Sequence, residues 1–441
     1  MKDTEHAPGI HPELEHHINE TPFVNTHEHQ APEQQWLEDG PKDVLHDLFI
    51  NYIKSDLIGA GCDPKAWARA LDGNDPDIAG RWNGIKDVWE TVQFTGYGEA
   101  VRILAKRVYG IDEITPASLE AAQPKLDALR KPGGRRRLVI EMANVDHAQI
   151  DDFQWACLPD PAGPDVFLYD ISWEDFSSGI VKAEDIYQET GIEVNDLRTL
   201  RQAMEAIFDK YAACAIAVKS QHAYNRTLLW RPRTDADAER ILQKRLKGEP
   251  VSPEEALVLG DWGLARGAEL CARHNLPFKH HTGYHGSSNI MVPEWIPSGN
   301  MWELIKTYRD TRFVLMHIAY PYQAEAVAMA KHYTNVYLDM CWAWALNPYA
   351  SMDFVRQYIH AAPIHKLFAF GGDVFWPSGS VAYAIQARRW LTRALSAEVR
   401  EGDLTLAEAK GIATRIMNRN QYECFDVEGT RRAIAGKVGQ G

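Results

Sequence analysis

Short apolar runs alternate with helix-like stretches along most of the chain. Between the later runs, apolar spacing predicts helices over residues 253–274, 301–310, 322–332, 350–361 and 380–395. Uniformly apolar runs are typical of strands covered on both faces, and their alternation with helices indicates a parallel sheet. Eight such units favour an α/β fold, a (β/α)8 TIM barrel, over an open sheet. The predicted strands are residues 22–26, 138–144, 165–170, 214–219, 277–281, 312–317, 335–340 and 366–371.

Two connections are longer than a barrel needs. Residues 31–137 separate the first two predicted strands and contain helical patterns, so we expect a helical insertion over one barrel face. Residues 171–210 form a second, smaller insertion after strand three. The chain then divides into an N-terminal extension (1–21), a barrel that includes the first insertion (22–402) and a C-terminal helical tail (403–441).

Composition narrows the class of protein. Of 441 residues, 45% are hydrophobic, and 47 basic residues against 61 acidic ones give a net charge of −14. A folded protein is therefore expected, and a nucleic-acid partner, which needs a basic face, is disfavoured. Neither a run of the roughly 20 apolar residues that span a membrane nor a signal peptide is visible. Six scattered cysteines without a CxxC pair indicate reduced thiols. We expect a cytoplasmic homo-oligomer that acts on a small molecule, without a membrane partner.

Histidines follow the first predicted strand in a pattern that suits metal binding. His27 and His29 lie two residues apart, so on an extended chain both imidazoles point to the same side. Imidazole is the commonest nitrogen ligand of zinc and related metals. The pattern alone leaves open the alternative of two loop histidines without a ligand.

Three later strands also end in residues that could bind a metal. The fifth ends in His280 and His281, and because adjacent strand residues face opposite sides, we select His281, which precedes Thr282-Gly283. His317 and Asp373 end the sixth and eighth strands. Closure of a barrel brings these strand ends to one rim, where active sites of such barrels lie. Several imidazoles with one carboxylate suit Zn, or Mn or Fe, better than Mg or Ca. The pattern is compatible with either one or two bound ions.

The fourth predicted strand ends in a lysine. Lys219 could be an N-carboxylated ligand that bridges two metals, a partner of a substrate carboxylate, or half of a structural salt bridge. Arg226, a few residues further, has the geometry to pair with an anionic group. Aromatic residues after the last strands could flank a sugar or ring, although packing explains them equally well. The predicted substrate contacts are His222, Tyr224, Arg226 and Trp376.

These motifs together resemble the amidohydrolase superfamily, specifically its amidohydrolase-2 branch of metal-dependent barrels. The resemblance covers roughly residues 22–395 and includes uronate isomerase as a relative with a similar helical insertion. It is carried by His27-x-His29, by Lys219 in Val-Lys-Ser-Gln-His-Ala-Tyr-x-Arg, by His281-Thr-Gly, by His317 and by Gly-Gly-Asp373.

The resemblance also implies roles. His27, His29 and Asp373 would hold a metal, while Lys219, His281 and His317 would complete that site or bind a second metal or the substrate. Asp373 would act as general base toward a metal-activated water, and the metal or His317 would polarise the attacked carbonyl. The leading hypothesis is a hydrolase of an amide, ester or lactone in a small anionic molecule. The alternatives are a uronate isomerase-like or decarboxylase (lyase) activity, and a catalytically silent metal-binding barrel.

Overall fold

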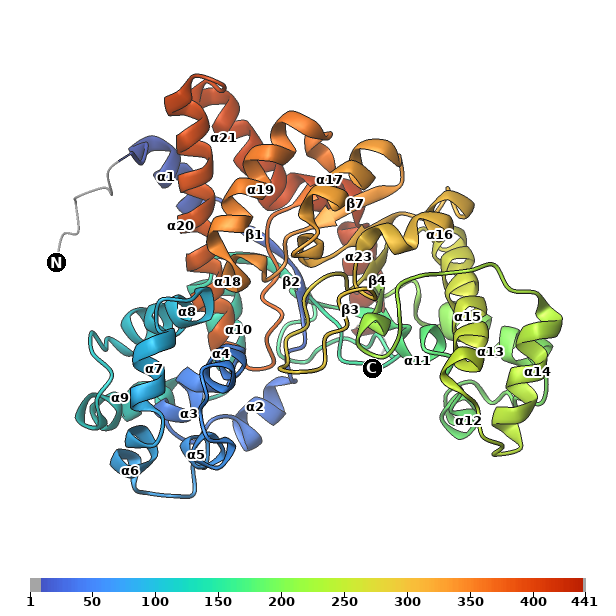
Figure 1. Ribbon diagram of the computed structural model, residues 1–441, viewed down its shortest axis with the longest axis horizontal. Helices are drawn as coiled ribbons and strands as arrows, with labels where there is room; N and C mark the ends of the chain where they lie inside the picture. Colours follow the sequence, from blue (N-terminus) through green and yellow to red (C-terminus); the bar gives the residue numbers. More distant parts are fainter. Residues whose placement is uncertain (1–8, 439–441) are drawn as a thin grey trace.

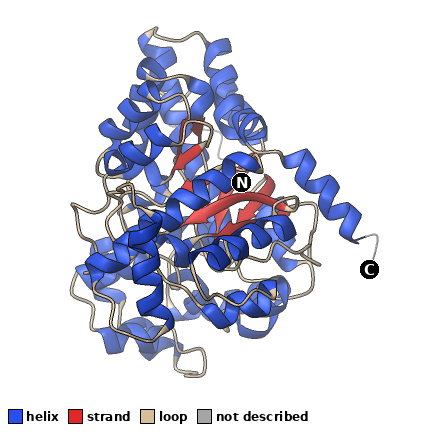
Figure 2. Ribbon diagram, turned by 90° about the vertical axis from the view of Figure 1, so that its right-hand side faces the viewer, coloured by secondary structure: helices blue, strands red, loops and turns tan. Residues whose placement is uncertain are grey.

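The computed structural model describes residues 9–438, and its centre is one sheet of eight parallel strands surrounded by helices (Figures 1 and 2). Neighbouring strands follow chain order from β1 to β8. The Thr26 amide donates to the Phe370 carbonyl at 3.0 Å, and the Asp373 amide donates to the His27 carbonyl at 3.0 Å, so the sheet closes into a TIM barrel. The strands are β1 Phe23–Glu28, β2 Val145–Ile150, β3 Phe167–Ser172, β4 Ala215–Ser220, β5 Phe278–His280, β6 Phe313–Leu315, β7 Val336–Asp339 and β8 Leu367–Phe368.

One predicted strand is wrong. The apolar run 138–144 forms a π-helical segment, η2 (Arg137–Met142), which buries Leu138 and packs against the long helix α20 (Ser378–Glu401). The second strand begins instead at Val145. It was missed because His147 and Gln149, both fully buried, give it a polar face that a search for apolar runs passes over.

The first insertion lies between β1 and β2 and therefore extends to residue 144. Its helices gather at the lower left of Figure 1. Phe49 packs against Trp82 and Trp89 with ring centroids 5.9 and 5.2 Å apart, which gives the insertion an apolar centre. Its elements are α2 Glu33–Asp39, α3 Val44–Phe49, α4 Ile53–Gly59, α5 Pro64–Ala70, α6 Ile78–Asn83, α7 Lys86–Val92, α8 Gly96–Leu104, η1 Ala105–Tyr109, α9 Pro116–Leu129, α10 Gly134–Arg136 and η2.

The second insertion follows β3, as expected. It consists of α11 (Glu174–Ser177), α12 (Ala183–Thr190) and α13 (Leu197–Tyr211), and it lies beside α14 (Asp235–Leu246) and α15 (Pro253–Arg273) at the right of Figure 1. A capping box starts α13 at its N-cap and another starts α15, so local sequence fixes where both helices begin.

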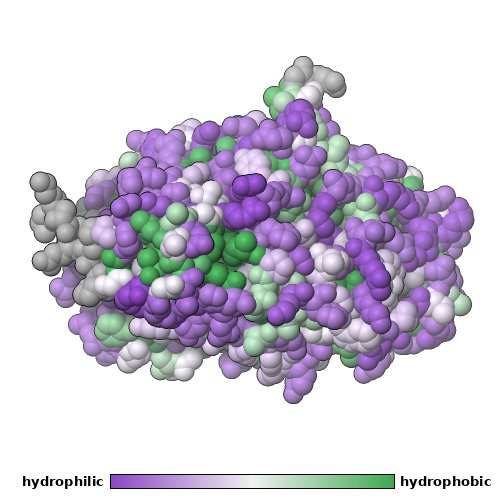
Figure 3. Space-filling view, turned by 90° about the horizontal axis from the view of Figure 1, so that it is seen from above, coloured by the Kyte–Doolittle hydropathy of each residue, from purple (hydrophilic) through white to green (hydrophobic). Residues whose placement is uncertain are grey.

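The remaining helices complete the outer layer. Helix α1 packs against α20 and α21, so both ends of the described chain cover the barrel. Within residues 9–438, no helix has the length and apolar character to cross a bilayer. The face seen in Figure 3 is largely hydrophilic, with one apolar area near its left edge. The elements are α1 Pro12–Glu20, η3 His222–Tyr224, η4 Ser298–Met301, α16 Trp302–Thr307, η5 His317–Ala319, α17 Gln323–His332, α18 Ala343–Leu346, α19 Pro348–Ala361, η6 Ile364–Lys366, α21 Leu406–Thr414, η7 Arg415–Arg419, α22 Asn420–Cys424 and α23 Val427–Val438.

Candidate metal centre

Barrel closure gathers three imidazoles around the carboxylate of Asp373. One oxygen, Oδ1, lies 3.3 Å from His27 Nε2 and 3.5 Å from His29 Nε2. The other oxygen, Oδ2, lies 3.8 Å from His317 Nε2. His27 and His29 come from the end of β1, His317 follows β6 and Asp373 follows β8. Residues far apart in sequence thus meet at the carboxyl-terminal rim of the barrel, where TIM-barrel enzymes carry their active sites.

Two of these histidines lack hydrogen-bond partners. His27 and His317 are fully buried, and within residues 9–438 neither ring nitrogen of either side chain is hydrogen-bonded. Leaving a buried polar atom unpaired costs about 1–3 kcal/mol. Burial, reinforced by the nearby Lys219 ammonium, lowers the pKa of both imidazoles well below the usual value. Neutral imidazoles with free nitrogens beside a buried carboxylate fit a divalent metal ion.

His29 is oriented by a backbone group. Its Nδ1 lies 2.6 Å from the Asp151 carbonyl oxygen, which assigns the ring proton to Nδ1 and turns Nε2 toward Asp373. Such a contact to the second nitrogen is typical of metal-ligating histidines. The side-chain amide nitrogen of Gln221 lies 2.8 Å from the same Nε2, and Phe153 stacks on the ring with centroids 4.6 Å apart. The ring is therefore held on three sides.

The double histidine after β5 separates into two environments. The His281 ring lies 4.3 Å from the His317 ring, and its Nε2 lies 3.0 Å from the Tyr284 carbonyl oxygen. His280 packs instead against Phe278, with ring centroids 4.1 Å apart. His281 is thus the member of the pair that faces the centre, as strand alternation requires.

Lys219 is fully buried near the same rim. Its Nζ lies 4.0 Å from Asp151 Oδ2, and within the described chain neither atom forms a hydrogen bond. Asp151 directly follows β2, the strand that the sequence placed too early. The Asp151 carboxylate was therefore missed. With β2 correctly located, its position directly after a strand would have identified it as a candidate site residue.

An open pocket of about 350 Å³ leads to the centre. Of the predicted substrate contacts, Tyr224 lines it. The Tyr224 ring stacks on His285 with centroids 4.2 Å apart, and its hydroxyl accepts a hydrogen bond from the Gly286 amide at 2.9 Å. The wall consists of His29, Tyr52, Phe153, Glu174, Gln221, Tyr224, Asn225, Gly286, Ser287 and Asp373.

Arg226 does not line this pocket, which corrects the role expected from the sequence. Its guanidinium donates to Asp261 on α15 at 2.6 Å and also to the backbone carbonyls of Ser177 and Leu229. Both members of the ion pair are almost fully buried. Because its guanidinium donors are used in this way, Arg226 links α15 to the loop after β4 and has no pair of N–H groups left to bind a substrate anion.

His222 and Trp376 also lie away from the described pocket wall. His222 Nδ1 is 2.8 Å from Ser220 Oγ, and its ring makes an edge-to-face contact with the His280 ring, with centroids 5.6 Å apart. Trp376 packs against Trp36 of α2 with ring centroids 5.8 Å apart. The sequence could not separate these residues from Tyr224, because the short turn η3 points successive side chains in different directions.

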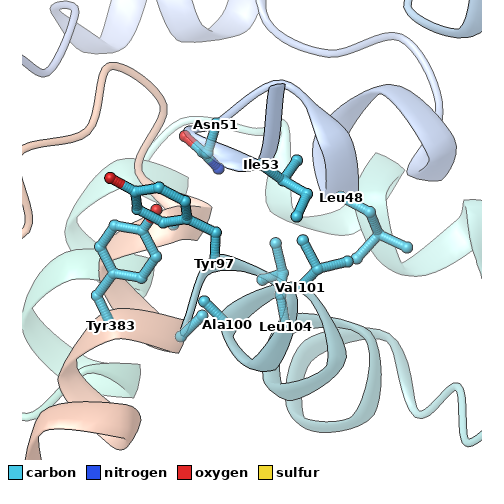
Figure 4. Close-up of a pocket in the computed structure, with 10 residues that line it drawn as sticks. Leu48, Asn51, Ile53, Tyr97, Ala100, Val101, Leu104 and Tyr383 are labelled. Carbon is cyan, nitrogen blue, oxygen red and sulfur yellow. The ribbon is translucent and has the colours of Figure 1, made fainter. Parts of the chain in front are cut away.

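The helical insertion supplies Tyr52, a wall residue that sequence reasoning missed. The Tyr52 hydroxyl donates a hydrogen bond to Asp373, and its ring stacks on Trp342 with centroids 4.6 Å apart. Tyr97 of α8 and Tyr383 of α20 lie beside each other where the insertion meets the barrel (Figure 4). The cavity at that joint is only about 10 Å³, so the insertion packs closely onto α20 and fixes Tyr52 over the centre.

Burial dominates the electrostatics of the centre. It raises the pKa of the Asp373 carboxyl above its usual value, although the nearby His29 and Lys219 lower it. Burial likewise raises the pKa of Glu28, behind Asp373, to about 7, and Ser380, Asn25 and the Val374 amide all donate to its carboxylate. Such a dry, charged pocket is costly to maintain unless a ligand compensates it.

Comparison with known proteins finds a family match over part of the chain. Residues 206–405, which include β4 to β8, match the family model described as amidohydrolase. Protein fluG of Emericella nidulans is 27% identical over 271 residues, which are 57% of this chain and 30% of that protein. The chain therefore spans less than a third of the length of this relative.

Two solved structures share the fold over nearly the whole chain. Glucuronate isomerase from Caulobacter crescentus superimposes with a TM-score of 0.76 at 17% identity, covering 94% of this chain and 93% of that one. Uronate isomerase from Thermotoga maritima gives 0.71 at 13% identity, covering 96% and 100%. At these identities the likeness concerns the fold, which includes the helical insertion within the covered length.

Proposed function

We propose that the chain, whose residues 206–405 match the amidohydrolase family model, is a metal-dependent hydrolase that cleaves an amide, ester or lactone bond of a small molecule. One observation carries the proposal. The buried Asp373 carboxylate faces three imidazoles and also forms part of the wall of the open pocket. A proton acceptor, a set of metal ligands and a space for substrate therefore share one point, as metal-assisted hydrolysis requires.

In this proposal His27, His29 and Asp373 hold the metal, because their ligand atoms lie within 4.8 Å of one another. Zinc, or manganese or iron, suits this mixture of nitrogen and oxygen donors. When bound, such an ion lowers the pKa of water to near 7 and so supplies a nucleophile at neutral pH.

The protein's own side chains would manage the proton. Asp373 accepts it from the attacking water and returns it to the leaving group, since its carboxylate reaches the pocket. Tyr52 holds the Asp373 carboxylate by a hydrogen bond from above. His317, with two free ring nitrogens on the far side of Asp373, is placed to polarise the attacked carbonyl.

The charge of the wall indicates which molecules fit. Of the residues that line the pocket, Glu174 and Asp373 are acidic, and none is Arg or Lys. The Glu174 carboxylate accepts hydrogen bonds from the backbone N–H of Gln221 at 2.6 Å and from the Asn225 side-chain amide at 2.8 Å. Away from the metal ligands, a substrate carboxylate would meet like charge here, with no lysine or arginine in the pocket wall to compensate it.

A second pocket, about 560 Å³ in volume, continues the acidic wall. It shares Phe153 and Glu174 with the first pocket, and its basic residue Lys182 is paired with Asp175 at 2.8 Å. We therefore replace the anionic substrate expected from the sequence by a neutral or amine-bearing one. The same wall disfavours a sugar acid, which is the substrate class of the isomerase alternative.

Three amide substrates test the proposal. They share the same acyl group and the same chain length and differ only in the terminal group of the amine part, which is an ammonium, a methyl group or a carboxylate. With the zinc-loaded protein in ¹⁸O-labelled water, we expect label in the released acid. The ammonium and methyl compounds should have a higher kcat/KM than the carboxylate. The Glu174→Gln variant should reduce the preference for ammonium over carboxylate by about tenfold, which corresponds to about 1.4 kcal/mol.

Two other results would contradict parts of the proposal. Isomerisation of glucuronate without incorporation of label, together with no cleavage of amides, esters or lactones, would replace hydrolysis by isomerisation. Fastest cleavage of the carboxylate compound would leave hydrolysis intact but would refute the argument from the charge of the wall. The His27→Asn variant is the control for the metal, since it should lose turnover together with the ion that His27, His29 and Asp373 would hold.

A further inference from the structure

A cysteine lies beside the metal centre and is not used by the function proposed above. Cys341 follows β7 and is fully buried. Its Sγ, a ring nitrogen of His317 and a carboxylate oxygen of Asp373 all lie within 4.8 Å of one another. Nothing in the sequence pattern distinguishes this cysteine from the other five, which are buried and free as well.

All three residues are among the non-glycine positions with a positive φ. His317, Cys341 and Asp373 follow three consecutive strands, β6, β7 and β8, and each has a left-handed backbone conformation, with φ values of 62°, 46° and 54°. A non-glycine residue in that region costs roughly 1–2 kcal/mol. Such strain collects at functional sites, where it directs side chains that regular strands would send elsewhere.

A glycine leaves room for the thiol. A Cβ at Gly371 would approach Cys341 Sγ to 2.8 Å and the His27 backbone nitrogen to 3.2 Å. Any larger residue would therefore push the thiol away from Asp373 or displace the strand that carries His27. The close approach of Cys341 to the centre thus depends on the absence of a side chain at this position.

Asp373 divides the ligands into two groups. Its Oδ1 faces His27 and His29, whereas its Oδ2 faces His317, whose two ring nitrogens have no hydrogen-bond partner within residues 9–438. A carboxylate that offers one oxygen to each of two groups is suited to bridge two ions, which in two-metal sites lie about 3.5–4 Å apart.

We infer that His317, Cys341 and Asp373 form a second metal position, next to the one that His27 and His29 share with Asp373. The inference shares Asp373 and His317 with the proposed function, and in it His317 would act as a metal ligand, so that the metal rather than the imidazole would polarise the carbonyl. Binding would break the Cys341 S–H bond and form a bond from the thiolate to the metal, with the proton released to water. Thiolate, imidazole and carboxylate together suit zinc or cobalt rather than magnesium or calcium.

Cobalt(II) reports a thiolate ligand directly, because sulfur-to-cobalt charge transfer absorbs in the near ultraviolet. The full chain, freed of metal and reloaded with cobalt, should show this band and bind two ions per chain. In the Cys341→Ser variant we expect loss of the band and one bound ion instead of two. The matched control is Cys214→Ser, another buried free cysteine, which should keep both the band and the two ions.

Cobalt bound without the band, or a band that survives in Cys341→Ser, would overturn the inference. X-ray absorption of the zinc-loaded native chain decides the matter if that variant does not fold: a sulfur neighbour at about 2.3 Å supports a thiolate ligand, and a shell of nitrogen and oxygen alone refutes it. Hydrolysis by a zinc enzyme without sulfur neighbours would leave the proposed function standing and remove only the second position. A chain that binds neither cobalt nor zinc would remove both.

Discussion

Two buried lysines on neighbouring strands show how differently this barrel treats charge. Lys219 on β4 and Lys279 on β5 are register partners, and both are fully buried. Lys279 donates to both oxygens of Asp170, at 3.0 and 2.9 Å, and to the Thr26 carbonyl at 2.8 Å. Lys219 forms no hydrogen bond in the described chain, and its carboxylate neighbour Asp151 is 4.0 Å away.

The difference separates a structural site from a functional one. Burial raises the pKa of the Asp170 carboxyl to about 6 although Lys279 lowers it, and the hydrogen bonds from Lys279 compensate the burial of both groups. Around Lys219 and Asp373, by contrast, several equally buried atoms are unpaired within the described chain: Lys219 Nζ, Asp151 Oδ2 and the ring nitrogens of His27 and His317. A protein tolerates unpaired buried groups where a ligand will satisfy them, and the rim of the barrel is such a place.

The largest effect on activity is expected from a change at Asp373, beside the unpaired side chains of the metal centre. Asp373→Asn removes the proposed base but keeps the size of the side chain, so kcat/KM should fall by about 10³-fold, within the range of general acid–base catalysis. The midpoint of urea unfolding of the metal-free protein serves as the control and should change little. Turnover within tenfold of the native value would exclude Asp373 as the base.

Breaking the satisfied pair should instead affect stability. Lys279→Met leaves the Asp170 carboxylate buried without its cation, and we expect the free energy of unfolding to fall by about 3–5 kcal/mol, measured by urea denaturation. The double variant Lys279→Met/Asp170→Leu removes both charges and should recover most of that loss. If the double variant were as unstable as the single one, packing rather than charge would explain the effect.

Metal removal should act only on the unpaired region. An ion present at 100 times its dissociation constant stabilises the folded chain by about 2.7 kcal/mol. Chelation should therefore lower the unfolding free energy by about that amount in the native protein. In His27→Asn, which keeps only the second proposed position, the drop should be clearly smaller, and an equal drop in that variant would show that His27 holds no metal.

The smallest effect tests the comparison most directly. Lys219→Met removes a buried ammonium that forms no hydrogen bond, so unfolding of the metal-free protein should change by no more than about 1 kcal/mol, toward greater stability. Calorimetric or urea unfolding would measure it beside Lys279→Met. A loss as large as that of Lys279→Met would mean that Lys219 is a structural residue after all.

Much of the barrel was predictable because its strands are covered on both faces. Seven predicted strands overlap β1 and β3 to β8, since apolar runs mark such strands plainly. The second escaped because polar His147 and Gln149 face inward. Once β2 was misplaced, Asp151 at its end was lost as well.

The site was predictable only in part, for a different reason. His27, His29, His317 and Asp373 were chosen because each follows a strand, and strand ends meet on one rim. Arg226 could bind an anion, but its guanidinium is paired with Asp261, which lies on the distant helix α15. Such pairing between distant elements leaves no trace in the local pattern.

The sequence by itself determined the order of strands and helices and the types of residue that end each strand, because hydrophobic periodicity and turn chemistry act over a few neighbouring residues. Only the tertiary structure decided which of those residues face one another. Tyr52 reaches Asp373 through the packing of a whole insertion, and Cys341 reaches it through a left-handed turn. Contacts of this kind depend on closure of the ring and on the direction of single side chains at irregular positions, which no short-range pattern encodes.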